Sequence, residues 1–187
     1  MYDRSYFERY DIGIGVVDYD SSELIKLVLD RVAADLVSYL RVDSALDVGC
    51  ATGHLVRSFL RRGVDAYGVD VSGYAVDRAN ADPVLSGRVR ILDVSASPLF
   101  GWYDLVTCIE VLEHIKEEGA LFAIANMCAI TNNIYFSSTP DQDRDSHVNM
   151  HEASYWIDAF GRNGFVVDDE FYSAVIPHGM LFRRVVS

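Results

Sequence analysis

The chain has 187 residues, of which 50% are hydrophobic, values typical of one globular domain with a full core. Its 16 basic and 28 acidic residues give a formal net charge of −12, which disfavours nucleic acid as a partner. Cys50, Cys108 and Cys128 lack metal-ligand spacing, and the sequence shows neither an apolar signal segment after Met1 nor an apolar run that could span a bilayer. We therefore expect a cytoplasmic protein with reduced thiols and no membrane segment.

The first forty residues divide into an arm and a helix. Residues 1–20 are rich in aromatic side chains and interrupted by glycines, so we expect an irregular arm that packs on the rest of the chain. Its aromatic residues are Tyr2, Tyr6, Phe7, Tyr10 and Tyr19. Asp20 and Glu23 have capping-box spacing, and apolar residues follow at helical intervals to Leu40. Residues 21–41 should therefore form an amphipathic helix.

The stretch 45–54, ALDVGCATGH, is typical of a buried strand, a glycine-bearing turn and the start of a helix. Gly49 and Gly53 let the backbone approach a ligand closely, and the helix start offers free N–H groups. A dinucleotide fingerprint needs glycines at positions 49, 51 and 54, and Ala51 and His54 do not fit it. The turn is expected to bind another kind of small polar ligand.

Three later strands are followed by acidic residues. The strand 64–69 ends at Asp70, which lies 21 residues after Gly49, close to the spacing of an acidic residue that holds ribose hydroxyls. The strand 89–92 ends at Asp93, and Glu110 follows a strand over 103–109. A single aspartate after a strand is typical of a turn or cap, whereas Asp47, Asp70 and Asp93, each at the end of a successive strand, together indicate a ligand site.

The rest of the chain continues the alternation of helices and strands. We expect helices over 121–130 and 152–162, and strands over 132–138, 165–172 and 180–186. This alternation predicts an α/β fold with a mostly parallel sheet, helices on both faces and a final antiparallel pair. Residues 1–187 are expected to form one domain with its core over 43–187.

The run Asp47-x-Gly49-x-Ala51-x-Gly53 resembles the first motif of the class I S-adenosylmethionine (SAM)-dependent methyltransferases, where the middle position is glycine. The resemblance implies their seven-stranded Rossmann-like sheet with an antiparallel last strand, and SAM as cofactor with S-adenosylhomocysteine (SAH) as product. It also implies that Asp70 binds the ribose and that Asp93 and Val94 bind the adenine. The implied cofactor-binding residues are Asp47, Gly49, Cys50, Ala51, Gly53, Asp70, Val71, Asp93, Val94 and Glu110.

In related methyltransferases an N-terminal arm closes over cofactor and substrate. The resemblance therefore implies that residues 1–20 act as a lid, and the alternative is an arm that only covers an apolar face.

The run Glu110-Val111-Leu112-Glu113-His114-Ile115 resembles one in the ubiquinone-biosynthesis O-methyltransferases, where the last pair borders the acceptor pocket. His114 is the predicted general base, because the first turn of a helix favours a neutral imidazole that accepts a proton. Glu113 and His147 complete the predicted catalytic set. In the alternative interpretation, Glu113 and His114 only cap the helix and fix the loop.

The same run, with His147, also resembles the two-Glu, two-His magnesium or manganese site of small-RNA 2′-O-methyltransferases. Carboxylates and imidazoles can coordinate a divalent ion, which lowers the pKa of an acceptor hydroxyl. The run also occurs in methyltransferases that are not expected to use metal. A metal site therefore stays open, but it is not the favoured interpretation.

Residues 147–156 resemble a segment of sugar- and polysaccharide-pathway methyltransferases that can line the acceptor pocket. Tyr155 and Trp156 would suit a sugar or another polyhydroxylated acceptor; alternatively they are core residues, Trp156 above all. The sequence thus predicts methyl transfer from SAM to a small molecule, most readily at a hydroxyl oxygen. A non-catalytic SAM-binding subunit is the alternative, and a nucleotide-dependent oxidoreductase is a distant third.

Overall fold

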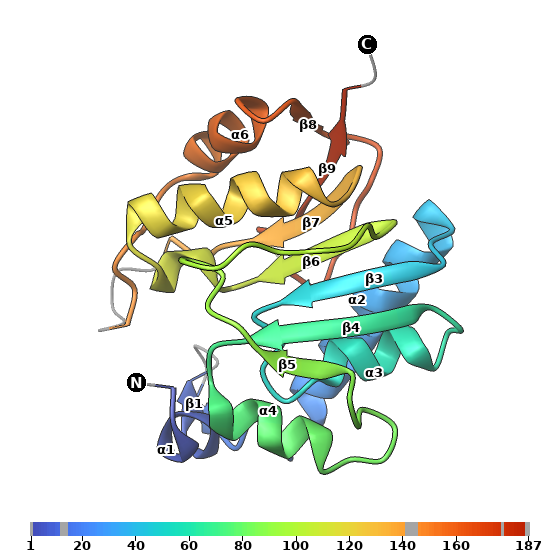
Figure 1. Cartoon of the computed structure of the whole chain (residues 1–187), viewed down its shortest axis with the longest axis vertical. Helices are drawn as coiled ribbons and strands as arrows, with labels where there is room; N and C mark the ends of the chain where they lie inside the picture. Colours follow the sequence, from blue (N-terminus) through green and yellow to red (C-terminus); the bar gives the residue numbers. More distant parts are fainter. Residues whose placement is uncertain (1, 12–14, 141–145, 177, 186–187) are drawn as a thin grey trace.

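The computed structural model describes residues 2–11, 15–140, 146–176 and 178–185, and it contains a seven-stranded sheet in the order β5-β4-β3-β6-β7-β9-β8 (Figure 1). β5, β4, β3, β6 and β7 pair in parallel, and β9 is antiparallel to both of its neighbours. The predicted α/β sheet with an antiparallel last strand is confirmed. The strands are β3 (Ser44–Val48), β4 (Asp65–Asp70), β5 (Val89–Ile91), β6 (Leu105–Ile109), β7 (Asn133–Ser137), β8 (Phe165–Val167) and β9 (Met180–Arg184).

Helices cover both faces of the sheet, because its central strands are apolar on both sides (Figure 1). On β3, Ala45 packs into one core and Leu46 and Val48 into the other, since successive side chains of a strand alternate. Trp156 is 1% exposed, which confirms its interpretation as a core residue. The first core contains residues of α2 (Glu23–Leu40), α3 (His54–Leu60) and α4 (Gly73–Asn80), and the second those of α5 (Glu117–Ala129) and α6 (Ala153–Gly161).

None of the helices within the described ranges has the length and the apolar surface that crossing a bilayer requires.

The N-terminal arm contains regular secondary structure, so the prediction of an irregular backbone is wrong. Its elements are the helix α1 (Arg4–Glu8) and the paired strands β1 (Tyr10–Asp11) and β2 (Val16–Val17). Asp3 caps α1 by accepting hydrogen bonds from two backbone N–H groups of the first turn. Phe7 is buried and packs against Tyr74 of α4, with ring centroids 5.8 Å apart. The helix cap and the buried Phe7 ring stabilise these elements. The elements are too short for their apolar residues to form a periodic pattern, so the sequence did not indicate them.

Several element boundaries differ from the predicted ones, and two of the differences have a clear local cause. Ser22 caps α2, because its hydroxyl accepts from the N–H of Ile25 at 3.4 Å, whereas Asp20 pairs with Arg78 instead. β8 ends at Val167 and not at residue 172, because the chain turns at Asp168, whose carboxylate accepts from a backbone N–H two residues later.

The segment after β6 does not begin a long helix. Leu112–His114 form a single 3₁₀ turn, η1, and α5 begins only at Glu117. His114 is the last residue of η1 and does not lie in the first turn of an α-helix. The helix-dipole argument for its neutral form therefore does not apply.

Candidate active site

A cavity of about 510 Å³ lies at the carboxyl ends of β3, β4, β5 and β6, where open parallel sheets bind their ligands. Its wall includes most of the predicted cofactor-binding residues: Gly49, Ala51, Asp70, Val71, Asp93, Val94 and Glu110. A second group of wall residues comes from the arm and from the segment after β6: Tyr2, Tyr6, Phe7, Tyr10, Tyr19, Val111, His114 and Ile115. The predicted residues outside this wall are Asp47, Cys50, Gly53, Glu113 and His147.

The glycine turn after β3 is held against β4 by backbone hydrogen bonds. The N–H of Gly49 donates to the carbonyl of Val69 at 2.8 Å, and the N–H of Ala51 donates to Oδ2 of Asp70 at 2.8 Å. Gly49 has a φ of +73°, and a Cβ there would collide with Val111, so this position requires glycine. Ala51 has a φ of +48°, which is uncommon for alanine. The bond to Asp70 stabilises that conformation.

Asp70 is oriented by two backbone donors. Its Oδ2 accepts from Ala51, and its Oδ1 accepts from the N–H of Ser72 at 2.8 Å. Burial raises the pKa of this carboxyl, whereas the two N–H donors act in the opposite direction by favouring the charged form. Each oxygen has a further lone pair that can accept from a ligand hydroxyl. The carboxylate is therefore preorganised at the wall of the cavity.

Three predicted cofactor residues, one on β3 and two in the glycine turn itself, do not line the cavity. The carboxylate of Asp47 accepts from the hydroxyl of Thr107 at 2.7 Å, and burial raises the pKa of Asp47 to about 7. The Cys50 thiol is buried, and Gly53, with a φ of +81°, precedes α3. From these positions the three residues support the turn. Their direct contact with a cofactor stays a prediction.

Glu110 follows β6 in a strained backbone conformation, with a φ of +55°. Its N–H donates to the carbonyl of Ser137 at 3.0 Å, and its Oε1 accepts from the hydroxyl of the same serine at 2.7 Å. The two bonds to β7 fix the carboxylate at the cavity. Strain of this kind clusters at functional sites.

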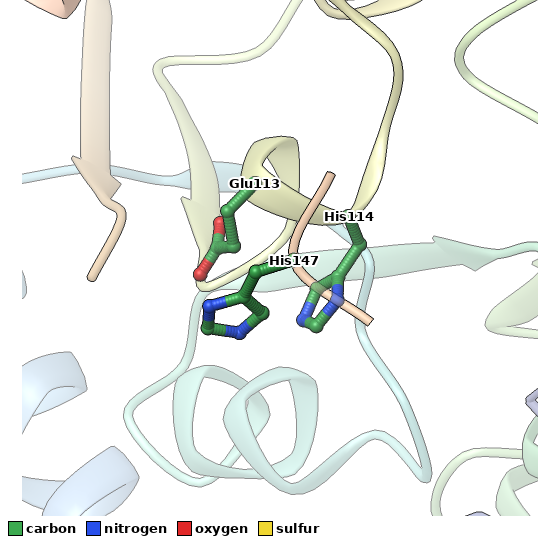
Figure 2. Close-up of side chains that lie close together, drawn as sticks. All are labelled: Glu113, His114 and His147. Carbon is green, nitrogen blue, oxygen red and sulfur yellow. The ribbon is translucent and has the colours of Figure 1, made fainter. Parts of the chain in front are cut away.

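Figure 2 shows that Glu113, His114 and His147, the predicted catalytic set, lie close together. Each can offer one ligating atom, and these atoms lie within 4.8 Å of one another. The carboxylate of Glu113 lies beside the ring of His147, and the ring of His114 lies on the other side of that ring (Figure 2). The two imidazoles meet edge to face, with centroids 4.7 Å apart.

Glu113 is buried in this cluster, with 0% of its surface exposed. Among the described residues, neither of its carboxylate oxygens has a hydrogen-bond partner. Burial, and then the neighbouring Glu110, raise the pKa of Glu113 well above its usual range. This environment favours the neutral acid over the carboxylate.

The backbone carbonyl of Ser146 selects one tautomer of His114. Nδ1 of the ring lies 3.1 Å from that carbonyl oxygen. Because a carbonyl can only accept, Nδ1 must carry the hydrogen. In the neutral ring, Nε2 is then the nitrogen that can take up a proton.

The sequence analysis missed several wall residues and misplaced one segment. Leu92, Ser95, Lys116 and Glu118 also line the cavity. The position of Leu92 and Ser95 just after β5 could have indicated this, whereas Lys116 and Glu118 lie at the start of α5. None of residues 147–156 lines it, so the prediction that this segment contributes to the pocket wall is wrong for this cavity. These residues pack behind η1 instead.

Comparisons with known proteins agree with this geometry. Residues 21–175 match the family model described as "Methyltransferase domain". The ubiquinone biosynthesis O-methyltransferase of Pectobacterium atrosepticum is 31% identical over 140 residues, 72% of this chain and 52% of that protein. The mitochondrial enzyme of the same description from Schizosaccharomyces pombe is 41% identical over 78 residues, 38% of this chain and 28% of that protein. The chain thus spans about half or less of the length of these relatives.

Solved structures share the fold at low identity. The SAH-bound magnesium protoporphyrin IX methyltransferase of Synechocystis has a TM-score of 0.68 at 22% identity, covering 87% of this chain and 84% of that chain. A SAM-bound amino pentose methyltransferase from Micromonospora echinaspora has a TM-score of 0.69 at 15% identity, covering 89% and 93%. Since the family model spans well over half of the residues, this chain belongs to the methyltransferase domain family, within the class I SAM-dependent methyltransferases.

Proposed function

We propose that this chain transfers the methyl group of SAM to a hydroxyl oxygen of a small molecule, with His114 as general base. The observation that carries the proposal is that His114 lines the same cavity as the glycine turn and Asp70. The carbonyl of Ser146 holds its ring in a tautomer that can accept a proton. The names of the curated relatives, which are O-methyltransferases, support a hydroxyl acceptor.

The residues at the strand ends suit SAM. Asp70 offers two oxygens, oriented by backbone donors, to the ribose hydroxyls. Asp93 can accept from the adenine amine, beside the apolar side chain of Val94. Val71, Glu110 and the turn at Gly49 and Ala51 form the rest of this part of the wall. When bound, SAM supplies a methyl group on a positively charged sulfur.

The segment after β6 then acts on the acceptor. Nε2 of His114 would take the proton of the acceptor hydroxyl while the oxygen bonds to the methyl carbon and the methyl–sulfur bond of SAM breaks, with SAH as the leaving group. The Nδ1–H bond to Ser146 keeps the ring oriented. A positioned base of this kind contributes about 10²–10⁴-fold to the rate. Glu113 and His147 lie against this histidine and outside the cavity wall, so they shape its surroundings.

The N-terminal arm closes the cavity over these groups. Tyr2 lies edge to face against His114, with ring centroids 5.8 Å apart. The hydroxyl of Ser72 donates to the backbone carbonyl of Tyr2, and Nε of Arg78 donates to Asp20 at 3.0 Å, so both ends of the arm are tied to α4. A closed arm excludes water from the reacting groups.

The acceptor part of the wall is mainly aromatic and aliphatic, with Tyr2, Tyr6, Val111 and Ile115 beside His114. Such a lining suits an acceptor with an apolar or aromatic body and one hydroxyl at His114. A sugar acceptor loses its support, because residues 147–156 do not line the cavity.

Methyl transfer to a panel of phenols, catechols and sugars tests the proposal, with labelled SAM and detection by mass spectrometry. We expect a methylated phenol or catechol, and we expect SAH, but not NAD, to raise the melting temperature, because a ligand of the folded state stabilises it. Stabilisation by SAH without any transfer across the panel would favour a non-catalytic SAM-binding subunit. Stabilisation by NAD alone would overturn the cofactor assignment.

A further inference from the structure

The turn that carries His114 is held from behind by a strap, which we define as residues 146–151. The N–H groups of Val148 and Asn149 both donate to the backbone carbonyl of Glu113, at 2.9 and 3.0 Å. The carbonyl of Ser146 in the same strap accepts from His114. The strap follows β7, whereas the turn follows β6, so the two meet only because the strands are neighbours in the sheet.

The side chain of Asn149 connects the strap to the turn η1 and to a second residue of the strap. Its Nδ2 donates to the carbonyl of Leu112 at 3.2 Å, and its Oδ1 accepts from Nε2 of His151 at 2.9 Å. The side chain is buried, with the residue 4% exposed. Because both ends of the amide are used, neither hydrophobic packing nor a chance surface contact explains an asparagine here.

The bonds of Asn149 continue to the start of α5. The ring of His151 stacks on Tyr155, with centroids 3.6 Å apart and planes at 13°. The hydroxyl of Tyr155 donates to Glu117, the first residue of α5, at 2.8 Å. The wall segment from Val111 to Gly119 is therefore held by the strap at η1 and by α6 at its other end.

We propose that Asn149 is a positioning residue for methyl transfer: it locks η1 to the strap, so that the Ser146 carbonyl holds the ring of His114 in the tautomer that accepts the acceptor proton. The inference rests on the proposed role of His114 as general base. Asn149 does not line the cavity. It acts only through the orientation of the histidine. In catalytic histidines, a group hydrogen-bonded to one ring nitrogen fixes the tautomer and the orientation of the ring.

The tautomer of His114 gives a readout that needs no acceptor. We would label the histidines with ¹⁵N, record two-bond ¹H–¹⁵N spectra of the SAH complex, and assign His114 by its loss in His114→Gln. In the wild type, the neutral ring should carry its hydrogen on Nδ1. In Asn149→Ala, we expect a mixture of tautomers, because the strap keeps its two backbone bonds to Glu113 but loses the side-chain bond to Leu112, so the carbonyl of Ser146 is held less firmly against the ring.

Asn149→Asp keeps an oxygen for His151 but loses the donor to Leu112, so it isolates the bond to the turn. If the alanine variant fails to fold, the aspartate variant still tests whether the bond from Asn149 to Leu112 positions His114. The matched control is Asn163→Ala, which removes an amide-to-carbonyl bond of 2.9 Å to Ala159 at the end of α6. It should leave the His114 signals unchanged.

With an acceptor from the panel, both Asn149 variants should lower kcat by about 10–100-fold at an unchanged KM for SAM, the scale of loss for a slightly misplaced reacting group. A folded Asn149→Asp with the wild-type tautomer of His114 and wild-type kcat would overturn the inference. Full activity of His114→Gln would instead overturn the base assignment, while the tautomer in the Asn149 variants still tests the positioning.

Discussion

The two halves of the cavity are built in different ways. The cofactor half is made of residues at successive strand ends, each fixed by main-chain bonds within its own βα unit or to the next strand, as for Gly49 and Asp70. The acceptor half is formed by the arm and by the segment that contains η1, and the strap, which lies outside the cavity wall, holds that turn from behind. The positions of its side chains depend on hydrogen bonds and packing between these segments.

This difference suggests how the two functions can vary separately. A site built from strand ends is as rigid as the sheet, so its geometry changes little when loops change. A site built from an arm, a turn and a strap can exchange each part without disturbing the sheet. We therefore expect substitutions in the two halves to have separable effects on cofactor affinity and on turnover.

The largest expected effect is on the acceptor half. His114→Ala should lower kcat by about 10²–10⁴-fold, because no positioned base then removes the hydroxyl proton. SAH affinity, measured by calorimetry, should stay at the wild-type value. Turnover of the wild type should fall at low pH, where the imidazole is charged and cannot accept a proton. Loss of both kcat and SAH affinity in the variant would show that His114 supports the whole cavity, and the two halves would not be separable.

The next effect concerns the stability of the cofactor half. Burial raises the pKa of Asp47 to about 7 in the folded chain, against about 3.9 unfolded. Between these pH values the folded chain binds a proton that the unfolded chain has lost, so the Asp47 contribution makes the free energy of unfolding fall as pH rises from about 4 to 7. Asp47→Asn should remove up to about 4 kcal/mol of this pH dependence, since one pKa unit corresponds to about 1.4 kcal/mol.

Urea unfolding without ligand at pH 5 and pH 8 captures about 2.6 kcal/mol of this difference, because about two of the three pKa units lie in that interval. The comparison is between the wild type and Asp47→Asn at each pH, so that other titrating groups cancel. An equal pH dependence in both proteins would mean that the carboxyl of Asp47 is ionised in the folded chain throughout this range.

A smaller effect is expected for cofactor affinity. Asp70→Ala should weaken SAH binding by about 1.5–3 kcal/mol, because the ribose hydroxyls lose a charged acceptor. The control is Asp65→Ala, which removes a carboxylate at the opposite end of β4. If calorimetry gave wild-type affinity for Asp70→Ala, the ribose would have to bind elsewhere, and the assignment of the two halves would be wrong.

The smallest expected effect is that of metal removal. Glu113, His114 and His147 place three ligating atoms within 4.8 Å, yet the proposed mechanism uses His114 as a base. We therefore expect EDTA to leave turnover unchanged. If EDTA abolished the activity and manganese or magnesium restored it, the acceptor half would instead be a metal site.

The sequence determined the parts that depend on near neighbours in the chain. The apolar runs that end in Asp70 and Asp93 indicate strands with polar ends, and the glycines at positions 49 and 53 indicate a turn that a ligand can approach closely. Because the carboxyl ends of parallel strands share one edge of the sheet, the strand pattern alone predicts that these residues meet.

Only the tertiary structure decided how the acceptor half is formed. The sequence suggested a helical first turn for His114, whereas the residue ends a 3₁₀ turn whose carbonyls are bonded to the strap. Asn149 was not among the predicted site residues, and the pairing of its amide with Leu112 depends on β6 and β7 being neighbours. Contacts between distant segments depend on the strand order and on the side chains that fill the space between them, and no local pattern of residues encodes that order.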